Sequence, residues 1–491
     1  MMSRHQCLNR RFLFSTLGVV TLLLFATGCP RPNASNAPAN GEPSAKPQAA
    51  AIRLLVIDDR PLGDAIAQQW RSRTESEIDL QHVTAAELAE ARRLPADVVI
   101  FPSGMLGQLT EHGLIVPLAS DALSNKEFAA REIFDGIRLA ETRWGHNAAA
   151  IPLGSPQLLL AYRADLFEQL ELQPPATWQD YQELAAKLAD RSLLGSFAPA
   201  EDAPWQAASE PLASGWAGQT LLARAAAYVT HRDQVAPLFN PETMQPLIDQ
   251  APFARALDEL AASQSMDQAR RLTPSEAVNE VLQNRAAMAI GWPVTGELAI
   301  KQSSANPVTD LRFVPLPGSP AVFNFALSDW EDRQSDEDIG ASLLGISGRQ
   351  AAVSSSANSP EAALNFLLWL GGSESSVPIS RASSASAPFR EKQLAQASNW
   401  IGFEGAIANS YGRALQQSLS RKQVLLVPRI PGRDEYLTAL DEAVFAVLEQ
   451  KSTSTAALRQ TADRWQEITE KRGREKQRLA YRRSLGVADW P

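Results

Sequence analysis

Residues Tyr162–Leu188 read YRADLFEQLELQPPATWQDYQELAAKL, and this stretch decides the fold. Pro174 and Pro175 fix their own φ angles and hold the chain extended, so they separate a short helix from a longer one. Thr177 is placed to cap the second helix, and Asp180 completes a capping box in which Asp replaces the usual Glu. The stretch therefore predicts a strand end, a short helix, a stiff break and a second helix.

The second helix of this stretch has one apolar face. Its apolar residues recur at helical spacing: Trp178, Tyr181, Leu184, Ala185 and Leu188. We interpret Trp178 as a packing residue for this reason. Three other tryptophans lie on similar helical stripes and receive the same interpretation: Trp70, Trp369 and Trp465.

The N-terminal segment has the layout of an export signal. Two arginines precede Phe12–Ala26, an apolar run that is short for a membrane span. The following Ala26–Cys29, ATGC, resembles a bacterial lipobox, which predicts removal of residues 1–28 as a lipoprotein signal peptide and lipidation of Cys29. Residues 29–51 are rich in Pro, Ala, Asn and Ser, as is typical of a flexible tether. The alternative is a soluble exported protein that is cut at a nearby site.

Size, cysteine content and charge narrow the class of protein. A chain of 491 residues with 45% apolar and 21% charged residues is typical of a globular protein with two domains. The only cysteines are Cys7 and Cys29, and Cys7 leaves with the signal, so the processed chain cannot form an internal disulfide. The chain has 46 basic and 55 acidic residues, whereas nucleic-acid binders are usually basic. We therefore expect a monomer held at a membrane surface, with no nucleic-acid partner.

Strand and helix patterns alternate in the first part of the chain. Strands are predicted at 52–57, 79–83 and 97–101, and helices at 62–73 and 85–92. This alternation favours βαβ units and a parallel sheet. Ligands in open α/β sheets bind beyond the carboxyl ends of the strands. The rule points to the loops that contain Asp59, after the first strand, and Ser103, Gly104 and Met105, after the third.

The opening stretch resembles a signature of bacterial extracellular solute-binding proteins, in the branch that includes maltose-binding protein. Arg163 and Ala164 stand where that family often has Asn and Lys. Further blocks resemble the family in the same order along the chain: Asp97–Leu118, Glu280–Trp292, Ser359–Gly371, Tyr436–Leu448 and the helix around Ala457–Ile468. The resemblance covers residues 52–470 in blocks, and the order of the blocks makes it specific.

The resemblance implies an α/β, periplasmic-binding-protein-like (type II) fold, with two α/β lobes and a ligand cleft between them. Mapped onto this chain, the N-lobe comprises residues 52–153 plus 318–372, and the C-lobe comprises 154–317 plus 373–470. Residues 373–389 are expected to form a Ser/Ala-rich loop. Residues 471–491 form a basic C-terminal tail, which is either a solvated helix extension or a segment that touches anionic lipid or a permease.

The same resemblance implies capture of a small solute, with a sugar-like solute favoured, for an ABC importer by lobe closure and without a cofactor. Aromatic rings can stack on the C–H faces of sugars. The expected ligand contacts are Asp59, Ser103, Gly104 and Met105 on the N-lobe, and Tyr162, Trp216, Trp292 and Tyr436 on the C-lobe side. Trp292 is the leading candidate, because a strand–loop junction is expected to turn its ring outward.

Two other functions stay open from the sequence. One is a sensor or adaptor that binds a ligand without transport, and the other is an exported hydrolase on a similar scaffold. The sequence contains no P-loop, no G-x-S-x-G elbow and no H-E-x-x-H, and its five histidines do not fall at metal-ligand spacing. We therefore expect a binding protein with no enzymatic activity and no metal site.

Overall fold

A computed structural model describes residues 51–487 except for 75, 89–90, 120, 265–270, 295–309 and 384. The predicted signal peptide, Cys29 and the tether up to residue 50 lie outside the described residues. Among the helices that are described, none has both the length and the apolar character needed to span a bilayer.

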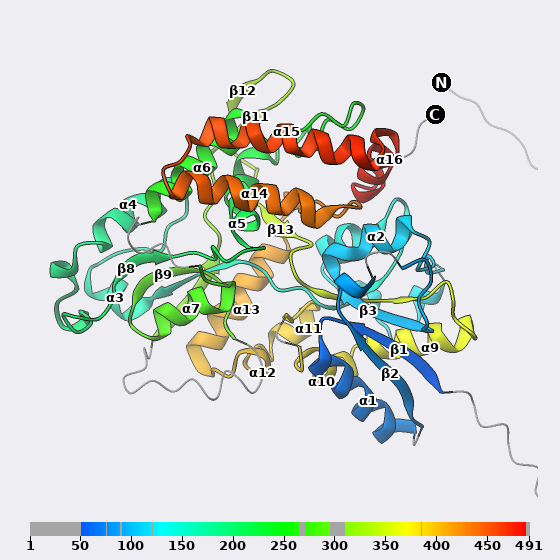
Figure 1. Ribbon diagram of the computed structural model, residues 1–491. Helices are drawn as coiled ribbons and strands as arrows, with labels where there is room; N and C mark the ends of the chain where they lie inside the picture. Colours follow the sequence, from blue (N-terminus) through cyan, green and yellow to red (C-terminus); the bar gives the residue numbers. More distant parts are fainter. Residues whose placement is uncertain are drawn as a thin grey trace, which may run out of the picture. The chain divides into compact units, whose positions relative to one another are not determined.

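A five-stranded sheet is built mainly from the first part of the chain (Figure 1). Its spatial order is β2-β1-β3-β14-β6, with β2 and β3 parallel to β1 and with β14 antiparallel to both of its neighbours. The bounds are β1 Ile52–Ile57, β2 Ile78–Val83, β3 Val98–Pro102, β6 Ile151–Gly154 and β14 Arg349–Val353. The three strands predicted for this region are confirmed.

Helices cover the faces of this sheet, which explains why the inner strand β3 is a continuous apolar run. The helix predicted at 62–73 is confirmed as α1, and the stretch predicted as a helix at 85–92 contains only the short turn η1 before the undescribed residues 89–90. The bounds are α1 Arg60–Thr74, η1 Ala86–Leu88, α2 Leu106–Glu111, α9 Pro360–Leu370 and α10 Ser376–Ser380.

A four-stranded sheet contains the strand end of the opening stretch. Its order is β10-β7-β9-β8, in which β7 is antiparallel to β9 and β10, and β8 is parallel to β9. The bounds are β7 Leu159–Arg163, β8 Gln206–Ser209, β9 Ala286–Gly291 and β10 Leu311–Pro315, with α3 Ala164–Gln169, α4 Trp178–Leu188, α7 Pro274–Leu282, α11 Glu391–Leu394, α12 Ser398–Ile401 and α13 Gly405–Leu419.

The local prediction for the opening stretch is confirmed in detail. The Thr177 hydroxyl accepts the Asp180 N–H at 3.1 Å, and the Asp180 carboxylate accepts the Thr177 N–H at 2.8 Å, which completes the capping box at the start of α4. Trp178 is buried, as is Trp465, and Trp70 packs edge-on against Phe366 with ring centroids 4.9 Å apart. These tryptophans are packing residues, as predicted.

A third group of helices lies next to both sheets. Figure 1 shows α14 and α15 side by side, with α5 behind α14, and these helices are in contact. The bounds are α5 Ala217–Val229, α6 Ala251–Ser263, α14 Arg433–Leu448, α15 Ser454–Arg472 and α16 Arg474–Ser484, with the short strands β11 Ala321–Asn324, β12 Asp329–Asp332, β13 Ser342–Leu344 and β15 Val424–Leu426. All of α5 is buried, and its sequence is mostly apolar; its one charged residue, Arg224, is paired with Glu210.

The segment expected to be a Ser/Ala-rich loop is packed against the five-stranded sheet. It contains α10, which contacts α1, α9 and β6, and Ser383 and Ser386 are buried after it. The Arg390 guanidinium then donates to the carbonyl oxygens of Phe128 and Ala129 at 2.8 and 2.9 Å. We therefore propose that the N-lobe extends to about residue 390 rather than ending at 372.

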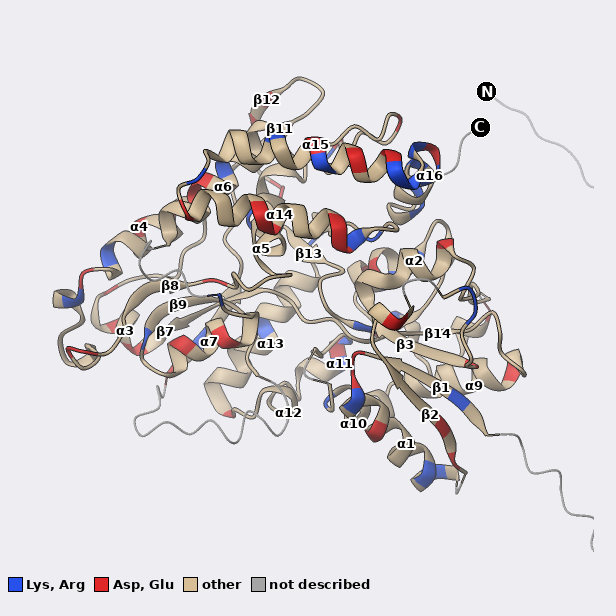
Figure 2. Ribbon diagram, viewed as in Figure 1, with Lys and Arg blue, Asp and Glu red and all other residues tan. Residues whose placement is uncertain are grey.

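The expectation of a solvated C-terminal tail is wrong for the described part of residues 471–491. Tyr481 of α16 is buried, and its hydroxyl accepts the N–H groups of Leu238 and Phe239 at 3.3 Å. Arg482 forms an ion pair with Glu242. Figure 2 shows acidic residues next to the basic ones at the end of α15 and in α16, and ion pairs such as Arg472–Glu435 and Arg478–Glu475 form within the molecule.

Candidate functional site

The carboxyl ends of β1 and β3 meet the start of β14, as expected for a ligand edge. Asp59 follows β1, Ser103 follows β3, and Arg349 opens β14 opposite Pro102. The Asp59 carboxylate accepts the Nε–H of Arg349 at 2.8 Å and also accepts the hydroxyl of Ser383. Its side chain is only 3% exposed. Asp59 is therefore engaged in a buried ion pair, which the sequence analysis missed because Arg349 lies 290 residues away.

The loop after β3 is covered by another part of the chain. The Ser103 N–H donates to the Gly348 carbonyl at 2.8 Å, and Ser103 is fully buried. Arg433, at the start of α14, lies directly over Gly104, where a Cβ atom would come within 2.2 Å of its Nε. Met105 stays half-buried. Of the N-lobe residues predicted to touch ligand, only Met105 thus has an accessible side chain.

Trp216 and Trp292 form an aromatic pair at the carboxyl edge of the four-stranded sheet. Trp292 follows β9, and Trp216 precedes α5; their ring centroids are 5.3 Å apart in an edge-to-face arrangement. Trp292 is 4% exposed, so the expectation that its ring turns outward is wrong. Trp216 is the more exposed member of the pair, because Trp292 packs behind it.

A carboxylate from α14 occupies the start of α5. Asp441 accepts the N–H of Gly218 at 2.7 Å and the N–H of Gly215, so it satisfies backbone donors at the positive end of the helix dipole. Burial raises the pKa of Asp441, and the two backbone hydrogen bonds oppose this shift. The sequence carried one signal for this contact, an acidic residue directly after Leu440 in the apolar stripe of α14.

The other two predicted contacts lie elsewhere. Tyr436 is fully buried, and its hydroxyl is 2.9 Å from that of Thr469, so it belongs to the packing between α14 and α15. Tyr162 is opposite Met288 in the middle of β9, and it lines a separate cavity of about 440 Å³ together with Arg312 and Arg413. The structure does not bring Tyr162 or Tyr436 to the edge that carries the tryptophan pair.

A buried carboxylate lies near the strand ends of the five-stranded sheet. Glu141 accepts the hydroxyl of Ser155, the residue after β6, at 2.7 Å, and its backbone carbonyl accepts the guanidinium of Arg429 at 2.6 Å. Burial raises the pKa of Glu141, although Ser155 and Arg429 oppose that shift. Across the described ranges, no group of three His, Cys, Asp or Glu side chains is arranged to hold a metal ion.

Comparison with known proteins identifies the family and similar folds. The sequence model of the family described as bacterial extracellular solute-binding protein matches residues 64–376. The structure of the sugar-binding protein MalE from Xanthomonas citri is similar, with a TM-score of 0.64, 16% identity, and coverage of 86% of this chain and 98% of that chain. No match was found among curated protein sequences.

Two further solved structures resemble the chain to a similar extent. One is a cyclo/maltodextrin-binding protein complexed with maltotetraose, with a TM-score of 0.58, 17% identity, and coverage of 87% of this chain and 99% of that chain. The other is an ABC transporter solute-binding protein from Agrobacterium radiobacter K84 in complex with ribitol, with a TM-score of 0.59, 16% identity, and coverage of 86% and 99%. The mixed α/β, two-lobed, periplasmic-binding-protein-like fold that the sequence predicted is confirmed.

Proposed function

The chain belongs to the bacterial extracellular solute-binding protein family, and on this premise we propose that it captures a carbohydrate for an ABC importer. The solute is a sugar, an oligosaccharide or a polyol, and the lobes close around it. Similar proteins solved with maltotetraose and ribitol support this class of solute. As members of the family and its neighbours are binding proteins, no catalytic role is assigned.

The Trp216–Trp292 pair carries the proposal. A half-exposed indole at a strand edge gives a flat apolar surface for the C–H face of a sugar ring, and Trp292 holds that indole edge-on at 5.3 Å. We propose Trp216 as the stacking residue and Trp292 as the residue that positions it. Met105 supplies an apolar contact from the opposite lobe, while Asp59 and Tyr436 keep the lobes folded.

A thermal-shift experiment on the full chain tests the proposal. Maltose, maltotetraose, ribitol and mannitol are added at millimolar concentration, and a bound solute raises the melting temperature because it binds only the folded state. Trp216→Ala removes the shift. Trp70→Ala, a half-buried tryptophan of α1 that packs against Phe366, is the matched control and keeps it. A panel in which no carbohydrate shifts the wild type would overturn the proposal.

A sensor or adaptor that holds its ligand without lobe closure is the second candidate. It is favoured by α16, which contacts both Glu111 of the predicted N-lobe and Glu242 of the predicted C-lobe, and such a bridge opposes hinge rotation. Small-angle X-ray scattering with and without the bound carbohydrate separates the two. A fall in radius of gyration favours the transport receptor, and an unchanged radius favours the sensor.

Membrane anchoring through Cys29 completes the proposed function. The lipobox-like Ala26–Cys29 supports this, and the family is extracellular. Labelling cells with radioactive palmitate tests it: the wild type takes up label and fractionates with membranes, whereas Cys29→Ser loses both properties. Label retained by Cys29→Ser would show that this residue is not the acceptor.

A further inference from the structure

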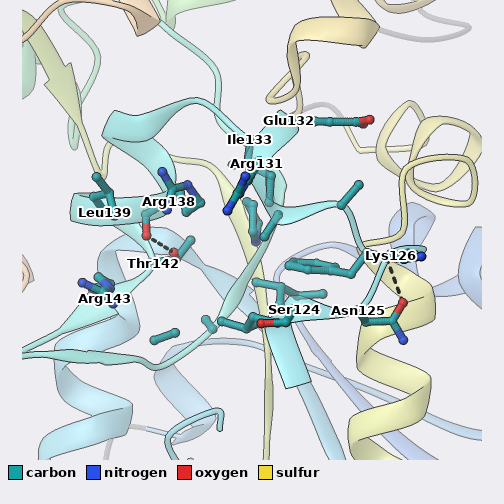
Figure 3. A pocket seen from close by; sticks show the side chains of 18 residues that line it. Ser124, Asn125, Lys126, Arg131, Glu132, Ile133, Arg138, Leu139, Thr142 and Arg143 are labelled. Carbon is teal, nitrogen blue, oxygen red and sulfur yellow. Dashed lines mark hydrogen bonds between the residues drawn. The ribbon is translucent and has the colours of Figure 1, made fainter. Parts of the chain in front are cut away.

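A cavity of about 730 Å³ is lined in part by β6, and neither tryptophan of the pair lines it (Figure 3). Its wall is made by η3 Ala122–Ser124, η4 Ala130–Glu132, η5 Gly136–Glu141, β4 Arg143–Trp144, β5 Asn147–Ala148 and β6. None of the residues assigned above to solute capture lines it. Its volume is within the range of roughly 300–1,000 Å³ that is usual for small-molecule sites.

Positive charge dominates the polar part of the lining. Lys126, Arg131, Arg138 and Arg143 all line the cavity, against one acidic residue, Glu132. Figure 3 shows the side chain of Glu132 directed away from the cavity, where it pairs with Lys392 and accepts the Ser373 hydroxyl.

The cations differ in whether the protein neutralises them. Arg138 is paired with Asp135 at 2.5 Å. Within the part of the chain that the structure describes, the side chains of Lys126, Arg131 and Arg143 have no ion pair with a carboxylate. The cavity therefore presents cationic groups that the molecule itself leaves unneutralised, and two of them are guanidinium groups.

Most of the remaining lining is apolar. Phe128, Ile133 and Ile151 are buried in the wall, and Leu139 at the rim is 46% exposed, which makes it one of the few large exposed apolar side chains among the described residues. A guanidinium pairs with a phosphate, sulfonate or carboxylate through two parallel hydrogen bonds. A ligand with an anionic head and an apolar body would satisfy both halves of this lining.

Two unusual backbone features lie in the wall of this cavity. The turn Gly136–Glu141 is π-helical and ends with the Thr142 N–H donating to the Ile137 carbonyl, five residues earlier, at 3.0 Å. This turn carries Arg138 and Leu139, and π-helical turns occur often at functional sites. Ala129, which also lines the cavity, has a φ of 49°, a strained value for a residue with a side chain.

We propose that this cavity binds an organic anion, in which a phosphate, sulfonate or carboxylate is joined to an apolar group. The anionic head pairs with Arg131 and Arg143, and the apolar body lies against Phe128 and Leu139. This site is separate from carbohydrate capture, so its ligand and the carbohydrate do not compete.

Fluorescence titration of the full chain tests the site with two dyes. Anilinonaphthalene sulfonate carries the anionic head, and phenylnaphthylamine is its uncharged analogue. We expect Arg131→Glu/Arg143→Glu to weaken binding of the sulfonate dye by about tenfold or more, and to leave the uncharged dye unchanged. The control Lys187→Glu/Arg459→Glu reverses two exposed cations elsewhere and binds the sulfonate dye like the wild type. Equal sulfonate binding by all three proteins would overturn the proposal.

Two further measurements complete this test: one controls for misfolding of the charge-reversal variant, and the other identifies the class of anion. Arg131→Gln/Arg143→Gln is a milder variant, and it shows the same direction of change if charge reversal harms folding. Displacement of the dye by hexyl phosphate, but not by hexyl glucoside, supports a soluble organic anion. Stronger displacement by dihexanoyl phosphatidylglycerol assigns the site to a lipid headgroup. Failure of both phosphates to displace the dye contradicts the proposal.

Discussion

Arg483 of α16 forms a two-point ion pair with Glu111 of α2, with Nε–Oε1 and Nη2–Oε2 distances of 2.8 and 2.6 Å. Oε1 of Glu111 also accepts the indole N–H of Trp144 at 2.6 Å. The other side of α16 is fixed by Tyr481, whose hydroxyl accepts the N–H groups of Leu238 and Phe239. One short helix thus connects residues assigned to both lobes.

Removal of this ion pair is expected to loosen the connection. Arg483→Ala should lower the free energy of unfolding by about 1–2 kcal/mol, since a two-point, charge-assisted contact is lost while Glu111 stays partly solvated. Urea unfolding of Arg483→Ala, Glu111→Ala and the double variant measures the coupling. Arg464→Ala, which breaks the exposed pair with Glu467, is the control and should leave the free energy of unfolding nearly unchanged. Additive effects at 483 and 111 would contradict the prediction.

Substitutions in the buried pair of Asp59 and Arg349 test whether Asp59 stabilises the fold or contacts the ligand. Asp59→Ala leaves a buried guanidinium without its carboxylate, so we expect a loss of about 3–5 kcal/mol in the free energy of unfolding. The double variant Asp59→Ala/Arg349→Met should recover much of that loss, because no charge stays buried. If Asp59→Ala keeps its stability but loses the carbohydrate-induced thermal shift, the residue contacts ligand, as the sequence suggested.

Glu141 should make stability depend on pH. Since burial raises the pKa of Glu141 above the value of about 4.3 expected for an unfolded chain, the folded state binds its proton more tightly. The resulting stability is fully present below that pH and is lost as pH rises through the folded pKa. Glu141→Gln keeps a partner for Ser155 and does not titrate, so its melting temperature should decline less than that of the wild type between pH 4 and 8. Parallel curves would show that Glu141 does not contribute.

The close contact of α5 with α14 predicts that Gly218 tolerates no side chain. A Cβ atom at this position would lie 2.6 Å from Cβ of Leu440 and 3.2 Å from the backbone nitrogen of Asp441. Alanine normally favours a helix over glycine by about 1 kcal/mol. Here we expect Gly218→Ala to destabilise the protein by about 1–3 kcal/mol, because α14 must move. Urea unfolding checks the sign, and a gain in stability would mean that the two helices separate without cost.

Local features of this fold could be predicted from the sequence, and contacts between distant segments could not. The Thr177–Asp180 capping box depends on residues three positions apart, and β3 is an apolar run that any neighbouring helix would bury. The two-lobed arrangement was predicted from the blocks that resemble the family, because hydrophobic periodicity predicts single helices and strands and not how they group into lobes.

The candidate site was harder to predict because its side chains are occupied by distant partners. Asp59 is paired with Arg349, Gly104 is covered by Arg433, and the ring of Trp292 is packed against Trp216. The family resemblance implied a ligand contact for Tyr436, yet its hydroxyl faces Thr469 on the next helix. A solvated extension was one of two expectations for the basic tail, and its internal partners could not be predicted because carboxylates such as Glu242 are far away in the sequence.

The position of β14 has a consequence for how the chain comes to be folded. This strand lies between β3 and β6, yet it begins at Arg349, about two hundred residues after β6 ends. Until that segment emerges during synthesis, β3 has one open edge, and such an edge recruits other strands or chaperones. The five-stranded sheet therefore cannot close before Val353 has been made, and a sheet that closes late keeps the chain unfolded for longer, which suits export in an unfolded state.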